Sequence, residues 1–198
     1  MKRPRGRPRK FDESAVLEAA AAVFWEKGFS GTSLDDLAEA MGMNRPSIYS
    51  AFGDKESIYR KTLEQFSEGM RQAVSATMFT QPNIRDALIA FYRAALDVYT
   101  GGAKPLGCMV ISTAVCAAPC HREVQSDLQA TLQAIDDSFK QRLEAAVKEG
   151  QLPANYETTM RARIAQGVLH SLSIRARAGE STRRLRSLIE SSVDLILS

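Results

Sequence analysis

Apolar residues recur at intervals of three and four along nearly the whole chain after residue 11, the spacing of one face of an α-helix. The first stripe runs from Val16 to Phe24, follows Asp12 as a candidate N-cap, and ends at Gly28. Further helices are predicted at roughly 33–41, 45–51, 54–79, 83–100, 121–149, 155–178 and 181–197. With a short helix in 103–119, the pattern predicts an all-α protein of about nine helices.

The segment 103–119 is the one stretch where periodicity leaves an alternative. Met109-Val110-Ile111 and Val115 have strand propensity, whereas the segment lies between helices and is bounded by Pro105 and Pro119. We favour a short helix, because the neighbouring segments are all helical.

Residues 33–52 have the pattern of a helix-turn-helix. Ala38 is small enough for a close helix crossing, and Gly42 can adopt the positive φ of a tight turn. The inward apolar positions are Leu34, Leu37, Met41, Met43 and Ile48. The outward positions of the second helix are Asn44, Arg45, Pro46, Ser47, Tyr49 and Ser50. An outward face without acids suits the major groove of DNA, whereas an ordinary helical corner is the plainer interpretation.

Charge is distributed unevenly along the 198 residues. The formal net charge is +3, but residues 1–10 alone carry six lysines or arginines, which leaves −3 for residues 11–198. The arm residues Arg3, Arg5, Gly6, Arg7, Arg9 and Lys10 resemble an AT-hook. We expect this arm to lie in a narrow minor groove, and a solvated tail without such a role is the alternative.

The helix-turn-helix segment resembles the TetR family of bacterial repressors. The resemblance rests on Gly28-Phe29, Thr32-Ser33-Leu34-Asp35-Asp36-Leu37-Ala38, Met41-Gly42, Ser47-Ile48-Tyr49, Phe52, Asp54-Lys55-Glu56 and Ile58. It implies a three-helix DNA-binding domain (11–58) and a helical regulatory and dimerisation domain (59–198), which follow the basic arm (1–10).

The resemblance also implies roles for single residues on double-stranded DNA. Base contacts in the major groove would come from Asn44, Arg45, Pro46 and Ser47. Phosphate contacts would come from Thr32, Ser33, Tyr49 and Lys55.

In this family a small molecule binds in the helical body and moves the fourth helix, so the body should contain a pocket. A stripe of methionine and aromatic residues is its candidate lining, although plain core packing gives the same stripe. The candidates are Phe66, Met70, Val74, Phe91, Tyr92, Tyr99, Cys108, Met109, Leu128 and Phe139. We expect a largely apolar effector, since few charges interrupt these faces.

The last two helices are expected to form a homodimer interface, with intrachain packing as the alternative. Two recognition helices in a dimer read a near-palindromic site together. The interface candidates are Ile164, Gly167, Val168, Leu172, Leu185, Leu188, Ile189 and Ile196.

The sequence gives little support for catalysis, metal binding or cofactor binding. The chain has two histidines and three cysteines, with no phosphate-binding glycine loop or nucleophile elbow. We therefore expect no enzyme, metal site or cofactor, and the lack of a long apolar run or export signal indicates a cytoplasmic protein without membrane contact. The expected function is a ligand-released repressor. The alternatives are a redox or electrophile sensor acting through Cys108 and an architectural DNA-binding protein.

Overall fold

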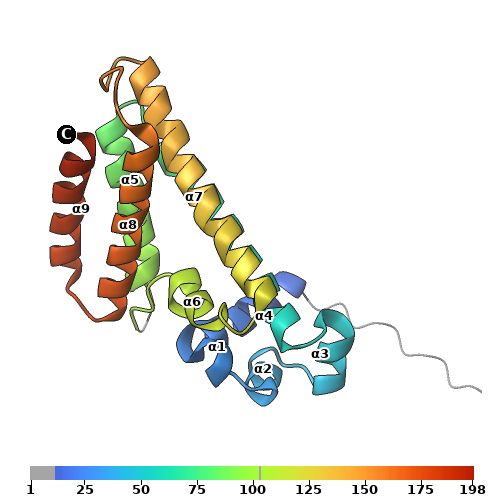
Figure 1. Ribbon diagram of the computed structural model, residues 1–198. Coiled ribbons are helices and arrows are strands. Elements are labelled where there is room, and N and C mark those ends of the chain that lie inside the picture. Colours follow the sequence, from blue (N-terminus) through green and yellow to red (C-terminus); the bar gives the residue numbers. More distant parts are fainter. Residues whose placement is uncertain (1–11, 103) are drawn as a thin grey trace, which may run out of the picture.

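The computed structural model describes residues 12–102 and 104–198, and the predicted arm lies outside these residues (Figure 1). Within them it contains nine α-helices and no strand, which confirms the all-α prediction. The helices are α1 (Glu13–Gly31), α2 (Leu34–Ala40), α3 (Arg45–Phe52), α4 (Lys55–Met78), α5 (Ile84–Thr100), α6 (Val115–Ala117), α7 (Arg122–Lys148), α8 (Thr158–Arg177) and α9 (Thr182–Leu197).

Polar caps explain where most of these helices begin. Side-chain oxygens of Asp12, Ser33, Asn44, Asp54 and Asn83 each accept a hydrogen bond from a backbone N–H in the first turn of the following helix. Such caps satisfy N–H groups that have no partner inside the helix. The sequence therefore determines these helix starts locally.

One prediction about local structure needs correction, and the short helix predicted in 103–119 is confirmed. At Gly28 the backbone adopts φ 72°, as expected of a helix end, but one further turn follows and α1 continues to Gly31. The strand alternative for Met109-Val110-Ile111 is wrong. Val110–Ala114 forms a π-helical turn that leads directly into α6.

Figure 1 shows α1, α2 and α3 gathered at one end of the molecule, with α8 and α9 toward the other. We call α1–α3 with the first turn of α4 the helix-turn-helix domain, and α5–α9 with the rest of α4 the body. Helix α5 packs against α4, α8 and α9, while the long helix α7 packs mainly on α8. The predicted domain boundary near residue 58 lies within α4, which is one continuous helix.

The two parts share one apolar core. Phe24 of α1 and Tyr59 of α4 are fully buried and make an edge-to-face contact with ring centroids 4.9 Å apart. The Tyr59 hydroxyl is hydrogen-bonded to the hydroxyl of Thr113 in the π-helical turn at 2.6 Å. The helix-turn-helix domain is therefore packed on the body without a linker.

Within residues 12–102 and 104–198, none of the helices has both the length and the hydropathy that a membrane-spanning helix requires.

Candidate nucleic-acid interface and effector cavity

The turn between α2 and α3 is built as the sequence predicts. Leu37 and Ile48 are fully buried, and Gly42 has φ 60°, which a residue with a Cβ rarely adopts. Ser33 and Asp36 form a reciprocal capping box at the start of α2, while the Asn44 side chain caps α3 by accepting from the Ser47 N–H. Two short helices are thereby held at a fixed angle.

The outer face of α3 is exposed to solvent. The exposed residues on it are Arg45, Pro46, Ser47, Tyr49 and Ser50. Tyr49 stands out as a large side chain with 51% of its surface exposed. The side-chain oxygen of Asn44 is already used by the cap, so only its amide NH₂ remains available as a base-reading group.

Arg45 is held by a partner that the sequence analysis missed. Its guanidinium donates two hydrogen bonds to the Asp35 carboxylate of α2, from Nε at 2.8 Å and from an Nη at 2.5 Å. This bidentate pair lowers the pKa of Asp35. It fixes the direction of Arg45 on the surface of the helix-turn-helix domain.

The predicted phosphate-binding residues divide into free and engaged groups. The buried Thr32 hydroxyl donates to the Gly28 carbonyl, and the Ser33 hydroxyl donates to Asp36. The Lys55 ammonium donates to the carbonyls of Phe29 and Thr32, both at 3.0 Å, and lies 4.4 Å from the Phe29 ring centre.

The reason for the position of Lys55 is the end of α1. Carbonyls at a helix C-terminus lack intrahelical partners and carry the negative end of the helix dipole, so they attract a cation. These two bonds use two of the three N–H donors of Lys55 and leave one for a phosphate. Of the four predicted phosphate ligands, only Tyr49 has an exposed side chain without a hydrogen bond inside the chain that the structure describes.

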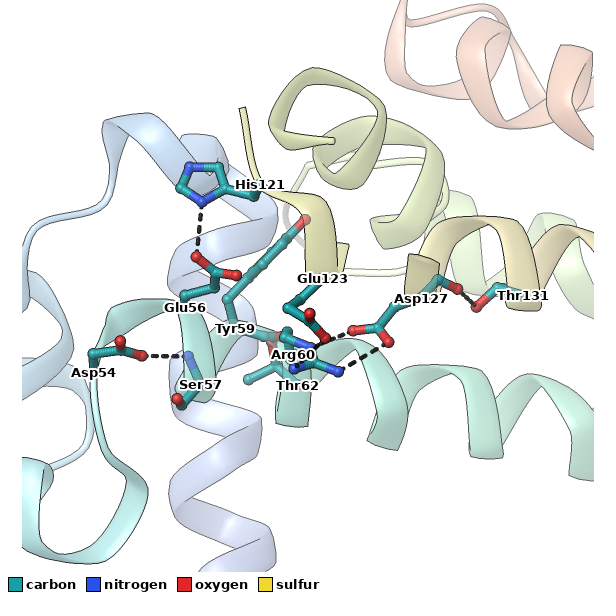
Figure 2. Close-up of polar contacts among 10 residues, drawn as sticks. All are labelled: Asp54, Glu56, Ser57, Tyr59, Arg60, Thr62, His121, Glu123, Asp127 and Thr131. Atoms are coloured by element: carbon teal, nitrogen blue, oxygen red, sulfur yellow. Dashed lines mark hydrogen bonds and ion pairs between the residues drawn. The ribbon is translucent and has the colours of Figure 1, made fainter. Parts of the chain in front are cut away.

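A polar junction connects α4 to α7 (Figure 2). The Glu56 carboxylate lies 2.8 Å from Nδ1 of His121, and Arg60 is paired with Asp127 at 2.5 Å and with Glu123 at 3.4 Å. These contacts hold the first turns of α4 against the start of α7. The sequence analysis did not find them, because 60 or more residues separate the partners.

The body encloses an apolar cavity of about 140 Å³ between α4, α5, α7, α8 and the π-helical turn. Six of the ten predicted lining residues are among those that surround it: Phe66, Met70, Val74, Phe91, Tyr99 and Cys108. It is also lined by residues that the prediction omitted, among them Ile111, Ile135 and His170.

The other four candidates lie elsewhere, and for them the expectation needs correction. Tyr92, Met109 and Phe139 are fully buried in the core but do not line this cavity. Leu128 lines a second, more open cavity of about 450 Å³ between α4 and α7, together with Arg60, Lys61 and Asp127. Helical periodicity identifies buried positions, but it does not identify where packing leaves a gap.

The three cysteines have different environments. Cys108 is buried against the cavity, and this burial raises the pKa of its thiol. Cys116 and Cys120 are exposed. Across residues 12–102 and 104–198 no three His, Cys, Asp or Glu side chains are grouped so that they could hold a metal ion.

The predicted dimer residues lie on two different faces of α8 and α9. Leu172, Leu185, Ile189 and Ile196 are buried within the chain itself, so they belong to the intrachain core. Ile164 is 43% exposed, Gly167 is exposed, and Val168 and Leu188 are partly buried. The outward stripe on α8 continues to Met160 and Ile174, each 60% exposed, and on α9 it continues to Leu195, which is 68% exposed.

Comparison with known proteins agrees with this architecture. The family model described as bacterial regulatory proteins, tetR family, matches residues 16–62. The model described as tetracyclin repressor-like, C-terminal domain, matches residues 85–192. Both parts of the chain therefore match the same kind of regulator.

Individual relatives match along nearly the full chain. The HTH-type transcriptional repressor ComR of Escherichia coli K12 is 28% identical over 196 residues, which cover 98% of this chain and 93% of ComR. A cysteine mutant of the TetR family regulator CifR, complexed with 26-bp operator DNA, is 29% identical with a TM-score of 0.89, and the match covers 96% of this chain and 98% of CifR.

A TetR family regulator from Cytophaga hutchinsonii shares the fold at 20% identity, with a TM-score of 0.83 over 95% of this chain and 96% of that one. The match to the C-terminal model alone spans more than half of the sequence. The chain belongs to the TetR family of bacterial transcriptional regulators.

Proposed function

We propose that this regulator is a homodimeric repressor that binds a near-palindromic operator and is released from it by a small, largely apolar ligand. The main support for the proposal is the position of α4 between the helix-turn-helix domain and the cavity. This helix begins directly after α3 and packs on α1 of the helix-turn-helix domain, and further along its length Phe66, Met70 and Val74 line the apolar cavity. A ligand that changes the packing around the cavity therefore acts on a helix that also contacts the helix-turn-helix domain.

The exposed face of α3 supports operator binding. Arg45 offers a planar group that can pair with guanine, Pro46 can contact a thymine methyl, and Tyr49 can reach the DNA backbone. A cysteine mutant of CifR, which resembles this chain along nearly its whole length, has a solved structure in complex with operator DNA. Base contacts by Arg45, Pro46 and Ser47, and a phosphate contact by Tyr49, are the contacts that we propose.

The outward stripe on α8 and α9 supports dimerisation. Met160, Ile164 and Ile174 follow one another at helical spacing, with Gly167 between them, and Leu188 and Leu195 continue the stripe on α9. Covering these side chains with the same stripe of a second copy removes apolar surface from water. It also places two recognition helices on one operator.

Sedimentation of variants tests the dimer. We expect Ile174→Asp to give monomers at micromolar concentration, because it buries a charge in the proposed interface. Val115→Asp is the matched control, since Val115 is also an exposed aliphatic residue but lies on α6, outside the stripe on α8 and α9. Equal dimer fractions for the two variants would exclude this interface.

The two alternatives receive less support. The thiolate is the reactive form of cysteine, and burial raises the pKa of Cys108, so Cys108 stays a thiol at neutral pH. An architectural DNA-binding protein leaves the cavity without a role. Ligand release without covalent chemistry accounts for both features.

A footprint on the DNA around the protein's own gene tests the repressor proposal. We expect one protected near-palindromic segment, followed by loss of protection when a small apolar effector is added. Even protection along the fragment would favour an architectural role. Protection that ends only on treatment with an oxidant, and not in Cys108→Ser, would favour the redox alternative.

The basic arm is tested separately, because residues 1–10 lie outside the described part of the chain. We expect their deletion to weaken operator binding and to flatten its dependence on salt, since six positive charges are lost. Affinity is measured at several salt concentrations. An unchanged affinity at moderate salt would reject the arm as a DNA-binding element.

A further inference from the structure

The apolar cavity contains two buried polar atoms that have no oxygen or nitrogen atom as a hydrogen-bond partner. They are the hydroxyl oxygen of Tyr99, whose residue is 1% exposed, and Nε2 of His170. The Cys108 thiol interacts with the Tyr99 hydroxyl, but a thiol is only a weak hydrogen-bonding group. Both residues line the cavity. A buried polar group without a partner costs about 1–3 kcal/mol, so each such group in a native structure requires an explanation.

Two other buried tyrosine hydroxyls of the body have hydrogen-bond partners. The Tyr92 hydroxyl donates to the carbonyl of Ala165 at 2.8 Å, and the Tyr59 hydroxyl is bonded to Thr113. Within the cavity lining itself, the hydroxyls of Thr131 and Ser138 donate to carbonyls of their own helix. Oδ1 of Asp136 and Nη1 of Arg142 are also buried without a partner, but neither residue lines the cavity, so Tyr99 and His170 are exceptions within its lining.

The cavity favours neutral guests. Burial raises the pKa of Tyr99 and Cys108 and lowers the pKa of His170, so all three are uncharged near pH 7. The charged group in the lining is Arg71, whose side chain is 59% exposed and already paired with Glu68. A buried charge on a guest would have no partner, which is strongly unfavourable.

The size of the cavity limits the guest further. Its volume of about 140 Å³ is close to that of an engineered apolar cavity of about 150 Å³ that binds benzene. Phe66, Phe91 and the ring of Tyr99 offer aromatic faces and edges around this space. One aromatic ring with a small substituent fits these limits.

From these observations we propose that the effector is a neutral molecule of single-ring size with one hydroxyl or carbonyl oxygen that accepts a hydrogen bond from Tyr99. His170 Nε2 is the second polar contact for the same guest. The assignment rests on the proposed function, in which this cavity is the effector site.

Phenol, benzene and benzoate are probes that differ by one group, and calorimetry with the full chain measures their binding. We expect phenol to bind about fivefold to tenfold more tightly than benzene, which is the value of one hydrogen bond of about 1 kcal/mol or slightly more. Benzoate should bind more weakly than either. In Tyr99→Phe, the affinities for phenol and benzene should differ by less than twofold.

Tyr92→Phe is the matched control, because it also removes one buried tyrosine hydroxyl, but one that lies outside the cavity. It should keep the preference of the wild type for phenol. The proposal is overturned if Tyr99→Phe keeps the preference, if benzoate binds as tightly as phenol, or if no probe binds at millimolar concentration.

Release of labelled operator DNA, measured in parallel, separates this inference from the proposed function. Phenol that binds with the expected selectivity without weakening operator binding would contradict the effector role of the cavity and leave its ligand chemistry standing. Operator release by phenol that is unchanged in Tyr99→Phe would contradict the ligand chemistry and leave the effector role standing.

Discussion

The helix-turn-helix domain and the cavity of the body differ in how their polar side chains are hydrogen-bonded. In the former, Ser33, Asn44, Arg45 and Lys55 each hold a defined partner at an exposed or half-buried position. In the latter, the Tyr99 hydroxyl is fully buried and has no oxygen or nitrogen partner. In the first region the polar side chains are already oriented before DNA binds. In the second region a polar group still lacks a hydrogen bond.

This difference indicates how the two regions bind. A surface whose side chains are already oriented loses little conformational entropy on binding DNA. A cavity with an unpartnered group gains a hydrogen bond when a guest supplies the missing partner. We expect substitutions in the two regions to differ accordingly in stability and in binding.

The largest contrast is expected from truncation of apolar side chains. Leu37→Ala, in the fully buried centre of the helix-turn-helix domain, should lower the free energy of unfolding by about 2–5 kcal/mol. Met70→Ala, whose half-buried side chain already borders the cavity, should cost about 1 kcal/mol. Denaturant unfolding at a fixed protein concentration measures both, and equal losses would contradict the contrast.

Arg45→Ala should reduce discrimination between the operator and a scrambled site by about 1–3 kcal/mol, the usual value of a bidentate contact to a base. The ratio of the two dissociation constants measures this change. Arg71→Ala removes an equally exposed arginine at the cavity and should leave the ratio unchanged. If both variants lower the ratio equally, Arg45 contributes only general charge.

Two Tyr→Phe variants, each of which removes one buried hydroxyl oxygen, compare a hydrogen-bonded tyrosine with the cavity tyrosine. Tyr59→Phe removes a buried hydroxyl that bonds Thr113, so it should cost about 1 kcal/mol of unfolding free energy. Tyr99→Phe removes a buried hydroxyl without a partner and should cost nothing or stabilise the protein slightly. A similar loss in both variants would show that Tyr99 is satisfied in solution.

The smallest effect expected is a pH dependence that comes from His170. Burial lowers its pKa below the ordinary value of 6.5, against the weaker opposing effect of Asp136. As the pH falls below 6.5 the unfolded chain takes up the proton first, so stability declines until the folded-state pKa is reached. Between pH 7.5 and 5.5, His170→Gln should lose less stability than the wild type, and parallel curves would reject this assignment.

Much of the fold can be predicted from the sequence, because its signals are local. Asp12, Asp54 and Asn83 cap the helices that they precede, and Gly42 permits the turn of the helix-turn-helix. The inward residues Leu37 and Ile48 follow from helical spacing. These features depend on residues only a few positions apart.

The site was less predictable, because it depends on distant partners and on which stripe faces which neighbour. Helices α8 and α9 each carry two apolar stripes, and the one that contains Leu172 and Ile189 faces the intrachain core. Nothing near Lys55 in the sequence indicates that it binds the carbonyls at the end of α1. The cavity is likewise a gap between five segments of the chain.

The length of α4 has a geometric consequence for regulation. Its 24 residues make a rod about 36 Å long, with Lys55 at one end and the cavity wall along its later turns. A tilt of roughly 5° about the far end of such a rod moves its first residue by roughly 3 Å. With a symmetry-related displacement in the second subunit of the proposed dimer, the separation of the two recognition helices changes by up to roughly 6 Å, nearly two base-pair steps, which puts them out of phase with successive grooves.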